Sequence, residues 1–204
     1  MMKILAFTDL HGSLAAYRAL QAKVRKEKPD CIFCLGDFTI FDAGIEVMLK
    51  KISNLGLPTL LIHGNHEDEV LVEELCSNYP NLLFVHNKVV ELGEYKIVAH
   101  GGGGFYGTGK HAREPEFDAL VKAAKKDLGG KLILITHAPP QNTKVDLSAW
   151  LKKHVGCASY GEFITKYKPI LALCGHLHEN AKVHEKKGRT LIVNPGPDGM
   201  VFRV

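Results

Sequence analysis

The 204-residue sequence, with 46% apolar and 24% charged residues, has the composition of a globular protein, which excludes a disordered or fibrous class. Its net charge of +4 favours the approach of anionic substrates, but dedicated nucleic-acid-binding proteins usually carry a denser basic surface. The length suits one sizeable core, so we expect residues 1–204 to form a single domain.

The first part of the chain alternates short apolar runs with stretches of helical period. Ser13 is the expected N-cap of the first helix, whose apolar residues recur at helical spacing. This β-α-β order predicts an α/β protein with a largely parallel central sheet. We expect strands at residues 3–8, 31–35 and 59–62, and helices at 13–26, 44–54 and 67–76.

The remainder of the chain is richer in strands. Residues 92–95 predict a hairpin turn. Two packed mixed β-sheets flanked by helices would account for both halves, and no linker or internal repeat divides the chain. We expect strands at residues 82–85, 88–92, 95–100, 132–136, 170–174, 180–185, 190–194 and 199–204, and helices at 114–128 and 160–167.

The cysteines and the longest apolar runs bear on location. Cys31 and Cys34 form a C-x-x-C pattern inside a predicted buried strand, whereas a redox-active pair normally begins a helix. Reduced, buried cysteines favour the cytoplasm. Because no apolar run approaches the ~20 residues of a membrane span, we expect no membrane association.

Polar residues gather where five predicted strands end. Ligands of α/β sheets bind beyond the carboxyl ends of strands, so these ends could converge on one crevice. Taken singly, an Asp-x-His or Gly-Asp pattern is more often an ordinary turn, but the ordered combination is far more specific. The five segments are Asp9-Leu10-His11-Gly12, Gly36-Asp37, His63-Gly64-Asn65-His66-Glu67, His137-Ala138-Pro139-Pro140 and Gly175-His176-Leu177-His178.

Seven of these side chains offer carboxylate, amide or imidazole donors and no thiolate. Such a set suits Mn, Fe, Zn, Co or Ni better than a structural zinc site. Seven donors exceed the needs of one tetrahedral ion and suit two ions that share a bridging carboxylate. The seven are Asp9, His11, Asp37, Asn65, His137, His176 and His178.

This ordered set resembles the calcineurin-like metallophosphoesterase superfamily, over residues 3 to about 197, and especially its small prokaryotic and archaeal members. The resemblance implies a four-layer αββα sandwich with the site at one end. It also implies that one metal is held by Asp9, His11 and His178, the second by Asn65, His137 and His176, and that Asp37 bridges them.

His66 would then be no ligand but would stabilise the transition state or donate a proton to the leaving oxygen. We therefore expect a dinuclear phosphoesterase that hydrolyses phosphodiesters in preference to monoesters by attack of a metal-bridging hydroxide. Asn65 and His66 would be the catalytic pair. Two divalent ions are the expected cofactors, with Mn favoured over Fe, Zn, Ni and Co.

The second motif departs from the usual Gly-Asp-x-x-Asp, because five residues separate Gly36 from Asp42. In such motifs an outer carboxylate often orients the metal ligands through hydrogen bonds. Here that carboxylate is either displaced to Asp42 or absent, which puts metal affinity and ligand orientation in question.

Two other functions compete with this interpretation. Some proteins of this fold are non-catalytic interaction scaffolds, but they have lost metal-site histidines that this sequence keeps. Nucleases of the superfamily carry additional DNA-binding segments, for which 204 residues leave little room. We expect a small phosphate-ester substrate, while nucleic acid and a homo-oligomer stay open. Candidate specificity segments are residues 39–42, 101–113 and 141–156.

Overall fold

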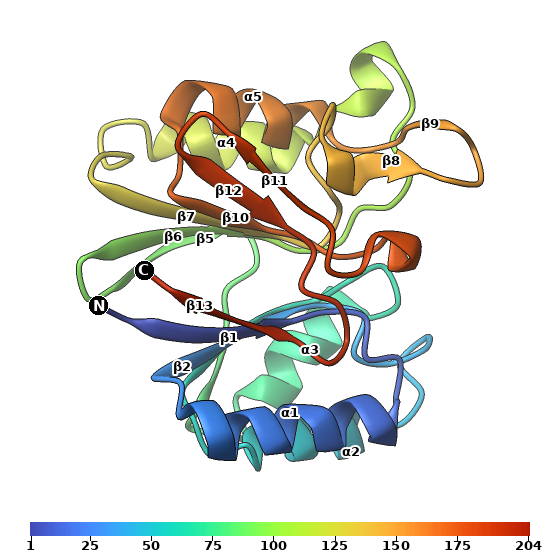
Figure 1. The fold of residues 1–204 in the computed structure, drawn as a ribbon, viewed down its shortest axis with the longest axis vertical. Coiled ribbons are helices and arrows are strands. Elements are labelled where there is room, and N and C mark those ends of the chain that lie inside the picture. Colours follow the sequence, from blue (N-terminus) through green and yellow to red (C-terminus); the bar gives the residue numbers. More distant parts are fainter.

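The computed structural model describes residues 1–108 and 111–204 in full and the backbone of 109 and 110. Two large β-sheets pack face to face, and helices cover both outer faces (Figure 1). The expected four-layer αββα arrangement is confirmed. No helix in the described part of the chain has the length and apolar character to cross a bilayer.

The first sheet consists of four parallel strands and one antiparallel edge strand. The edge strand is the C-terminal one, so the two chain ends lie side by side (Figure 1), and the Met2 N–H donates to the Val204 carbonyl (2.9 Å). In spatial order the strands are β13 (Met200–Arg203), β1 (Lys3–Phe7), β2 (Cys31–Leu35), β3 (Thr59–Ile62) and β4 (Leu82–Phe84).

The second sheet has four parallel central strands between two antiparallel edge strands. The expected hairpin at residues 92–95 joins β5 to β6, where Leu92 pairs with Tyr95. In spatial order the strands are β11 (His184–Lys187), β12 (Thr190–Val193), β10 (Leu171–Leu173), β7 (Lys131–Thr136), β6 (Tyr95–His100) and β5 (Lys88–Leu92). A separate short ladder joins β8 (Leu147–Ser148) to β9 (Lys153–His154).

Helices α1 to α3 pack against the outer face of the first sheet, and helices α4 and α5 pack against that of the second (Figure 1). The Ser13 side chain accepts from the Ala16 N–H at the start of the first helix (3.2 Å), which confirms the expected cap. The helices of the first sheet are α1 (Leu14–Glu27), α2 (Ile45–Ser53) and α3 (Glu69–Cys76), and those of the second are α4 (Pro115–Ala123) and α5 (Ala158–Tyr167).

The central strands are buried on both faces, which explains their uninterrupted apolar runs. In β1, Ile4 and Ala6 pack into the core between the two sheets, whereas Leu5 and Phe7 pack against the helices. A third apolar cluster lies between the second sheet and its helices. The sheet interface is therefore a continuous apolar layer that fixes the two sheets relative to each other.

Several predicted boundaries differ from the structure. Helix α5 begins at Ala158 instead of residue 160, and three other differences have a physical reason. Helix α3 begins at Glu69 because Asp68 caps it, so Glu67 lies before the helix. Helix α4 ends at Ala123 instead of residue 128, where exposed residues 125–127 supply no apolar contact. Strand β11 begins at His184 instead of residue 180, because the Asn180 side chain donates to two carbonyls outside the sheet and holds a 3-10 turn.

The sheet interface generates a test of the packing. Leu171→Ala removes a side chain that is 2% exposed between the sheets, so we expect a loss of about 2–5 kcal/mol in the free energy of unfolding. Leu83→Ala, at a position 53% exposed on an edge strand, should cost less than about 1 kcal/mol. Urea unfolding of both variants measures the difference. Equal midpoints would contradict the tight packing of Leu171 between the two sheets.

Candidate metal centre

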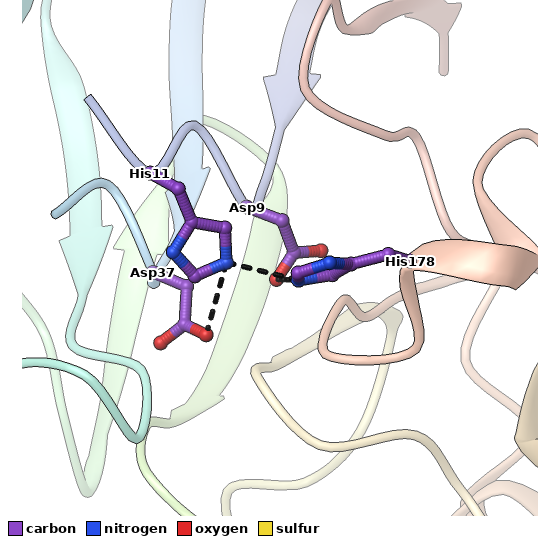
Figure 2. A group of neighbouring side chains, drawn as sticks. All are labelled: Asp9, His11, Asp37 and His178. Carbon is purple, nitrogen blue, oxygen red and sulfur yellow. Dashed lines mark hydrogen bonds and ion pairs between the residues drawn. The ribbon is translucent and has the colours of Figure 1, made fainter. Parts of the chain in front are cut away.

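The predicted donors come together at one end of the sandwich. Asp9, His11, Asp37 and His178 place one ligand atom each within 4.8 Å of all the others. Figure 2 shows the rings of His11 and His178 and the carboxylates of Asp9 and Asp37 gathered around one space. His11 Nε2 is 3.6 Å from Asp37 Oδ2 and 2.9 Å from His178 Nε2. These four side chains can surround one ion.

A second group lies directly beside the first. Asp37, His137 and His176 also place their ligand atoms within 4.8 Å of one another. Asn65 completes this group, because its Oδ1 lies 3.1 Å from His137 Nε2 and 2.7 Å from His176 Nδ1. Asp37 is the one residue that belongs to both groups. The arrangement therefore offers two neighbouring ion positions with a shared carboxylate.

The imidazole rings are oriented as metal-binding histidines usually are. Nδ1 of His11 donates to the Thr39 carbonyl (2.9 Å), and Nδ1 of His137 donates to the Leu35 carbonyl (2.8 Å). Both rings thereby direct Nε2 towards Asp37, at 3.6 Å for His11 and 3.4 Å for His137. Backbone acceptors behind the ring are the normal way in which proteins fix the tautomer of a metal ligand, so these residues fit a metal centre.

The electrostatics of the second group suit the same conclusion. Burial would raise the pKa of Asp37, but the hydrogen bond to His137 and the charges of His137 and His66 lower it to about 2. Burial, followed by the charge of His137, lowers the pKa of His176 to about 4. An ionised carboxylate and a neutral imidazole are the protonation states that bind metal.

His137 shows the opposite shift. Burial lowers its pKa, but the hydrogen bond and charge of Asp37 raise it to about 9. The positive charge of His137 thus compensates the negative charge of the buried Asp37 carboxylate.

Four of these residues have a left-handed backbone that side chains rarely adopt. The φ angles are +55° at Asp9, +43° at His11, +51° at Asp37 and +69° at His176. Each such residue costs about 1–2 kcal/mol in an unstrained chain, and outliers of this kind cluster at functional sites because the surrounding structure enforces them. Tight turns at the strand ends therefore direct the donors into the centre.

Two glycines allow the loops after β2 and β3 to approach each other. A Cβ atom at Gly64 would overlap the Asp37 carboxylate, and one at Gly36 would overlap the backbone of Gly64. The Asp37 carboxylate can occupy its place only because both positions lack a side chain.

Glu67 joins these two loops. Its buried carboxylate accepts from the N–H groups of Asp37 (2.9 Å), Thr39 (2.8 Å) and Gly64 (2.8 Å), and from the Thr39 hydroxyl (2.8 Å). Glu67 was expected in a helix, and this role was not predicted. The sequence did contain an indication of this role, because Glu67 lies directly after Gly64-Asn65-His66 and before Asp68, a residue type that commonly caps helices.

The displaced carboxylate of the second motif still contacts the neighbouring loop. The Asp42 N–H donates to the His66 carbonyl (3.0 Å), and Asp42 Oδ1 accepts from the Asp68 N–H (3.0 Å). Asp42 therefore supports the His66 loop, while Glu67 supports the loop that carries Asp37.

His66 stands beside the centre. Its N–H donates to Asp37 Oδ1 (3.0 Å), and its Nε2 lies 3.9 Å from Asp37 Oδ2. A cavity of about 310 Å³ opens here, and its wall includes Asp37, Asn65, His66, Phe105, His176 and His178. The ring of His66 thus borders the space in which a substrate would lie.

A third cluster contains His86, His100 and Glu116. Nδ1 of His86 accepts from the Gly101 N–H (2.8 Å), so the proton of the neutral ring is on Nε2. That nitrogen lies 3.8 Å from Glu116 and 3.6 Å from Glu69. His86 is therefore arranged as a donor to carboxylates, and its contacts do not fit a metal ligand.

Comparison with known proteins agrees with this geometry. Residues 2–180 match the calcineurin-like phosphoesterase family. The chain belongs to that family and is thus a phosphoesterase, a hydrolase whose family implies a dinuclear centre of divalent ions.

Three similar proteins illustrate the relationship. An uncharacterised protein of Methanocaldococcus jannaschii is 31% identical over 96% of this chain and 88% of its own length. The structure of TT1561 of Thermus thermophilus has a TM-score of 0.75 at 19% identity, covering 96% of this chain and 89% of that one. A dimetal phosphatase from Danio rerio has a TM-score of 0.66 at 9% identity, covering 95% and 86%. At these identities the two structures show the shared fold alone.

The Glu67 carboxylate can be tested separately from activity. Glu67→Ala leaves three buried N–H groups without their acceptor, so we expect a loss of at least about 2 kcal/mol in the free energy of unfolding. Glu69→Ala is the matched control, because the Glu69 side chain is half exposed and its loss should cost less than about 1 kcal/mol. Urea unfolding in the presence of EDTA removes any contribution of metal. Equal midpoints would show that Glu67 does not hold the loops.

Proposed function

We propose that this protein is a dinuclear metal-dependent phosphoesterase that prefers phosphodiesters to monoesters. In this proposal Asp9, His11 and His178 hold one ion, and Asn65, His137 and His176 hold the other. Asp37 bridges the two. The observation that carries the proposal is the membership of Asp37 in both ligand groups.

Two bound divalent ions would neutralise the phosphoryl oxygens and lower the pKa of a bound water towards about 7, so that hydroxide is available at neutral pH. The chain supplies the geometry for this chemistry. Asp37 sets the spacing of the two positions, and Asn65 contributes a neutral oxygen that adds no charge against an anionic substrate. Both sheets supply residues, which supports one metallophosphoesterase domain over residues 1–204.

His66 has a separate role in this proposal. It borders the cavity and belongs to neither ligand group, and its Nε2 lies 3.9 Å from Asp37 Oδ2. An imidazole at this place can donate a proton to the leaving oxygen, which is the role that histidine most often has in general acid–base catalysis.

Two further assignments concern the native ion and the cellular location. We propose manganese as the native ion, since the oxygen and nitrogen donors accept it along with Fe, Zn, Ni and Co. The five cysteines are buried, free thiols, which supports a reducing, cytoplasmic environment.

The activity test uses metal-stripped protein titrated with Mn²⁺, Co²⁺, Ni²⁺ or Zn²⁺. Hydrolysis of bis-p-nitrophenyl phosphate and p-nitrophenyl phosphate is measured side by side. We expect metal-dependent turnover with a higher kcat/KM for the diester. A higher value for the monoester would overturn the substrate preference. The absence of turnover and of bound metal under every condition would overturn the enzymatic proposal and favour an interaction scaffold.

The two roles around Asp37 are separated by substitution. His66→Ala should retain two ions per chain and lose most of kcat, by about 10²–10⁴-fold for a lost general acid. Asp37→Ala should lose both turnover and metal, because neither ligand group is complete without it. Elemental analysis after dialysis measures the metal content. Equal metal loss in the two variants would contradict the assignment of His66.

A further inference from the structure

The phenylalanines fall into two classes by exposure. Nine occur in the sequence, all within the described residues, and seven of them are buried. Phe41 and Phe105 are 76% and 62% exposed. Both exposed rings contact a histidine that lines the cavity of the metal centre. Apolar side chains that leave the core and gather at one site mark a binding surface.

Phe41 lies against His66. The two ring centroids are 4.4 Å apart and the planes are tilted by 45°. The φ angles of Phe41 and Asp42 are +49° and +59°, within a turn closed by the Ala43 N–H and the Ile40 carbonyl (3.0 Å). A turn of this type favours Gly, Asn or Asp at both central positions. A phenylalanine is strained there, and the turn places its apolar ring in water beside His66.

Phe105 lies against His176. The centroids are 4.9 Å apart with the rings edge to face, and Phe105 itself lines the cavity. The next residue is fixed, because the Tyr106 N–H donates to the Val155 carbonyl (2.9 Å) and the Tyr106 hydroxyl donates to Glu114 (2.8 Å). The ring is thus presented from an anchored segment of backbone.

We propose that Phe41 and Phe105 bind the organic groups of the substrate, and that these groups are planar and aromatic, as in a nucleoside phosphodiester. The proposal rests on the proposed function. His66 would give its proton to the leaving oxygen, so the ring beside it, Phe41, contacts the leaving group. Phe105, over His176, contacts the group that stays on phosphorus.

Two rings at two histidines match a substrate with two organic groups. A phosphate monoester has only one ester group and would leave one ring in water. An aromatic side chain stacked on a base contributes about 1–3 kcal/mol, so each ring can account for about fivefold or more in kcat/KM. The two rings therefore also supply a physical reason for the preference for diesters.

The experiment compares two esters that share a p-nitrophenolate leaving group. Bis-p-nitrophenyl phosphate retains an aromatic group on phosphorus, whereas methyl p-nitrophenyl phosphate retains a methyl group. Phe105→Leu should lower the ratio of their kcat/KM values at least fivefold relative to the unmodified protein. Phe41→Leu should lower kcat/KM for both esters at least fivefold and leave the ratio unchanged, because both leaving groups are aromatic.

Controls separate a lost ring from a damaged fold. Phe105→Tyr keeps an aromatic ring and should keep the ratio of the unmodified protein. Leu83→Ala changes an exposed apolar residue on an edge strand and should change neither quantity. Thermal melting of each variant verifies folding, since both phenylalanines are outside the buried core.

The outcomes distinguish the two proposals. If the unmodified protein hydrolyses neither ester with any metal, the proposed function fails. If it hydrolyses them and both Leu variants keep the normal rates and ratio, the proposed function stands and the two rings do not bind substrate. Competition with adenosine 5′-monophosphate and ribose 5-phosphate gives a second measurement. The base should strengthen inhibition about fivefold or more, and equal inhibition by the two compounds would overturn the nucleoside class.

Discussion

Three backbone N–H groups and one hydroxyl converge on the buried carboxylate of Glu67. The groups belong to two loops, one after β2 and one after β3, which contain Asp37 and Asn65 respectively. Thr39, held by Glu67 through both its N–H and its hydroxyl, offers its carbonyl to Nδ1 of His11. One side chain thereby positions a third loop that it does not touch. The arrangement of the candidate metal ligands depends on this carboxylate, although Glu67 belongs to neither ligand group.

The two sheets hold the loops of the site in backbone conformations that are unfavourable by themselves. Left-handed turns at Asp9, Asp37 and His176 are each unfavourable in a free chain. They persist because each follows a strand that is buried on both faces and paired on both sides. The apolar layers therefore contribute more than stability. They hold polar residues in conformations that these residues would otherwise leave.

Much of the fold and the clustering of the candidate metal donors could be predicted from sequence. Apolar runs such as residues 31–35 identify buried strands, and the polar residues after them fall at the ends of parallel strands, where sheets bind ligands. These features are local in the sequence and need no knowledge of the packing. The order of the motifs added the family resemblance, which the match over residues 2–180 confirmed.

The features that could not be predicted depend on contacts between segments that are distant in the sequence. Glu67 accepts from N–H groups about 30 residues away only because Gly36 and Gly64 meet without side chains. Phe38 and Phe41 are the same residue type in the same short segment, yet Phe38 is buried and Phe41 is exposed to water. Helix α4 ended early because exposed residues 125–127 gain nothing from a longer helix. Local pattern does not distinguish these cases.

The bond between the His176 N–H and the Asp9 carboxylate (3.1 Å) joins residues 167 positions apart. Contacts of this sequence separation form late, since the entropy of closing a long loop must be lost before the contact is gained. During synthesis, Asp9 leaves the ribosome long before His176 and His178, so neither ion position has its full set of donors until the second sheet has folded. The candidate ligand groups are thereby completed only together with the fold, and a partly synthesised chain offers only isolated carboxylates and imidazoles.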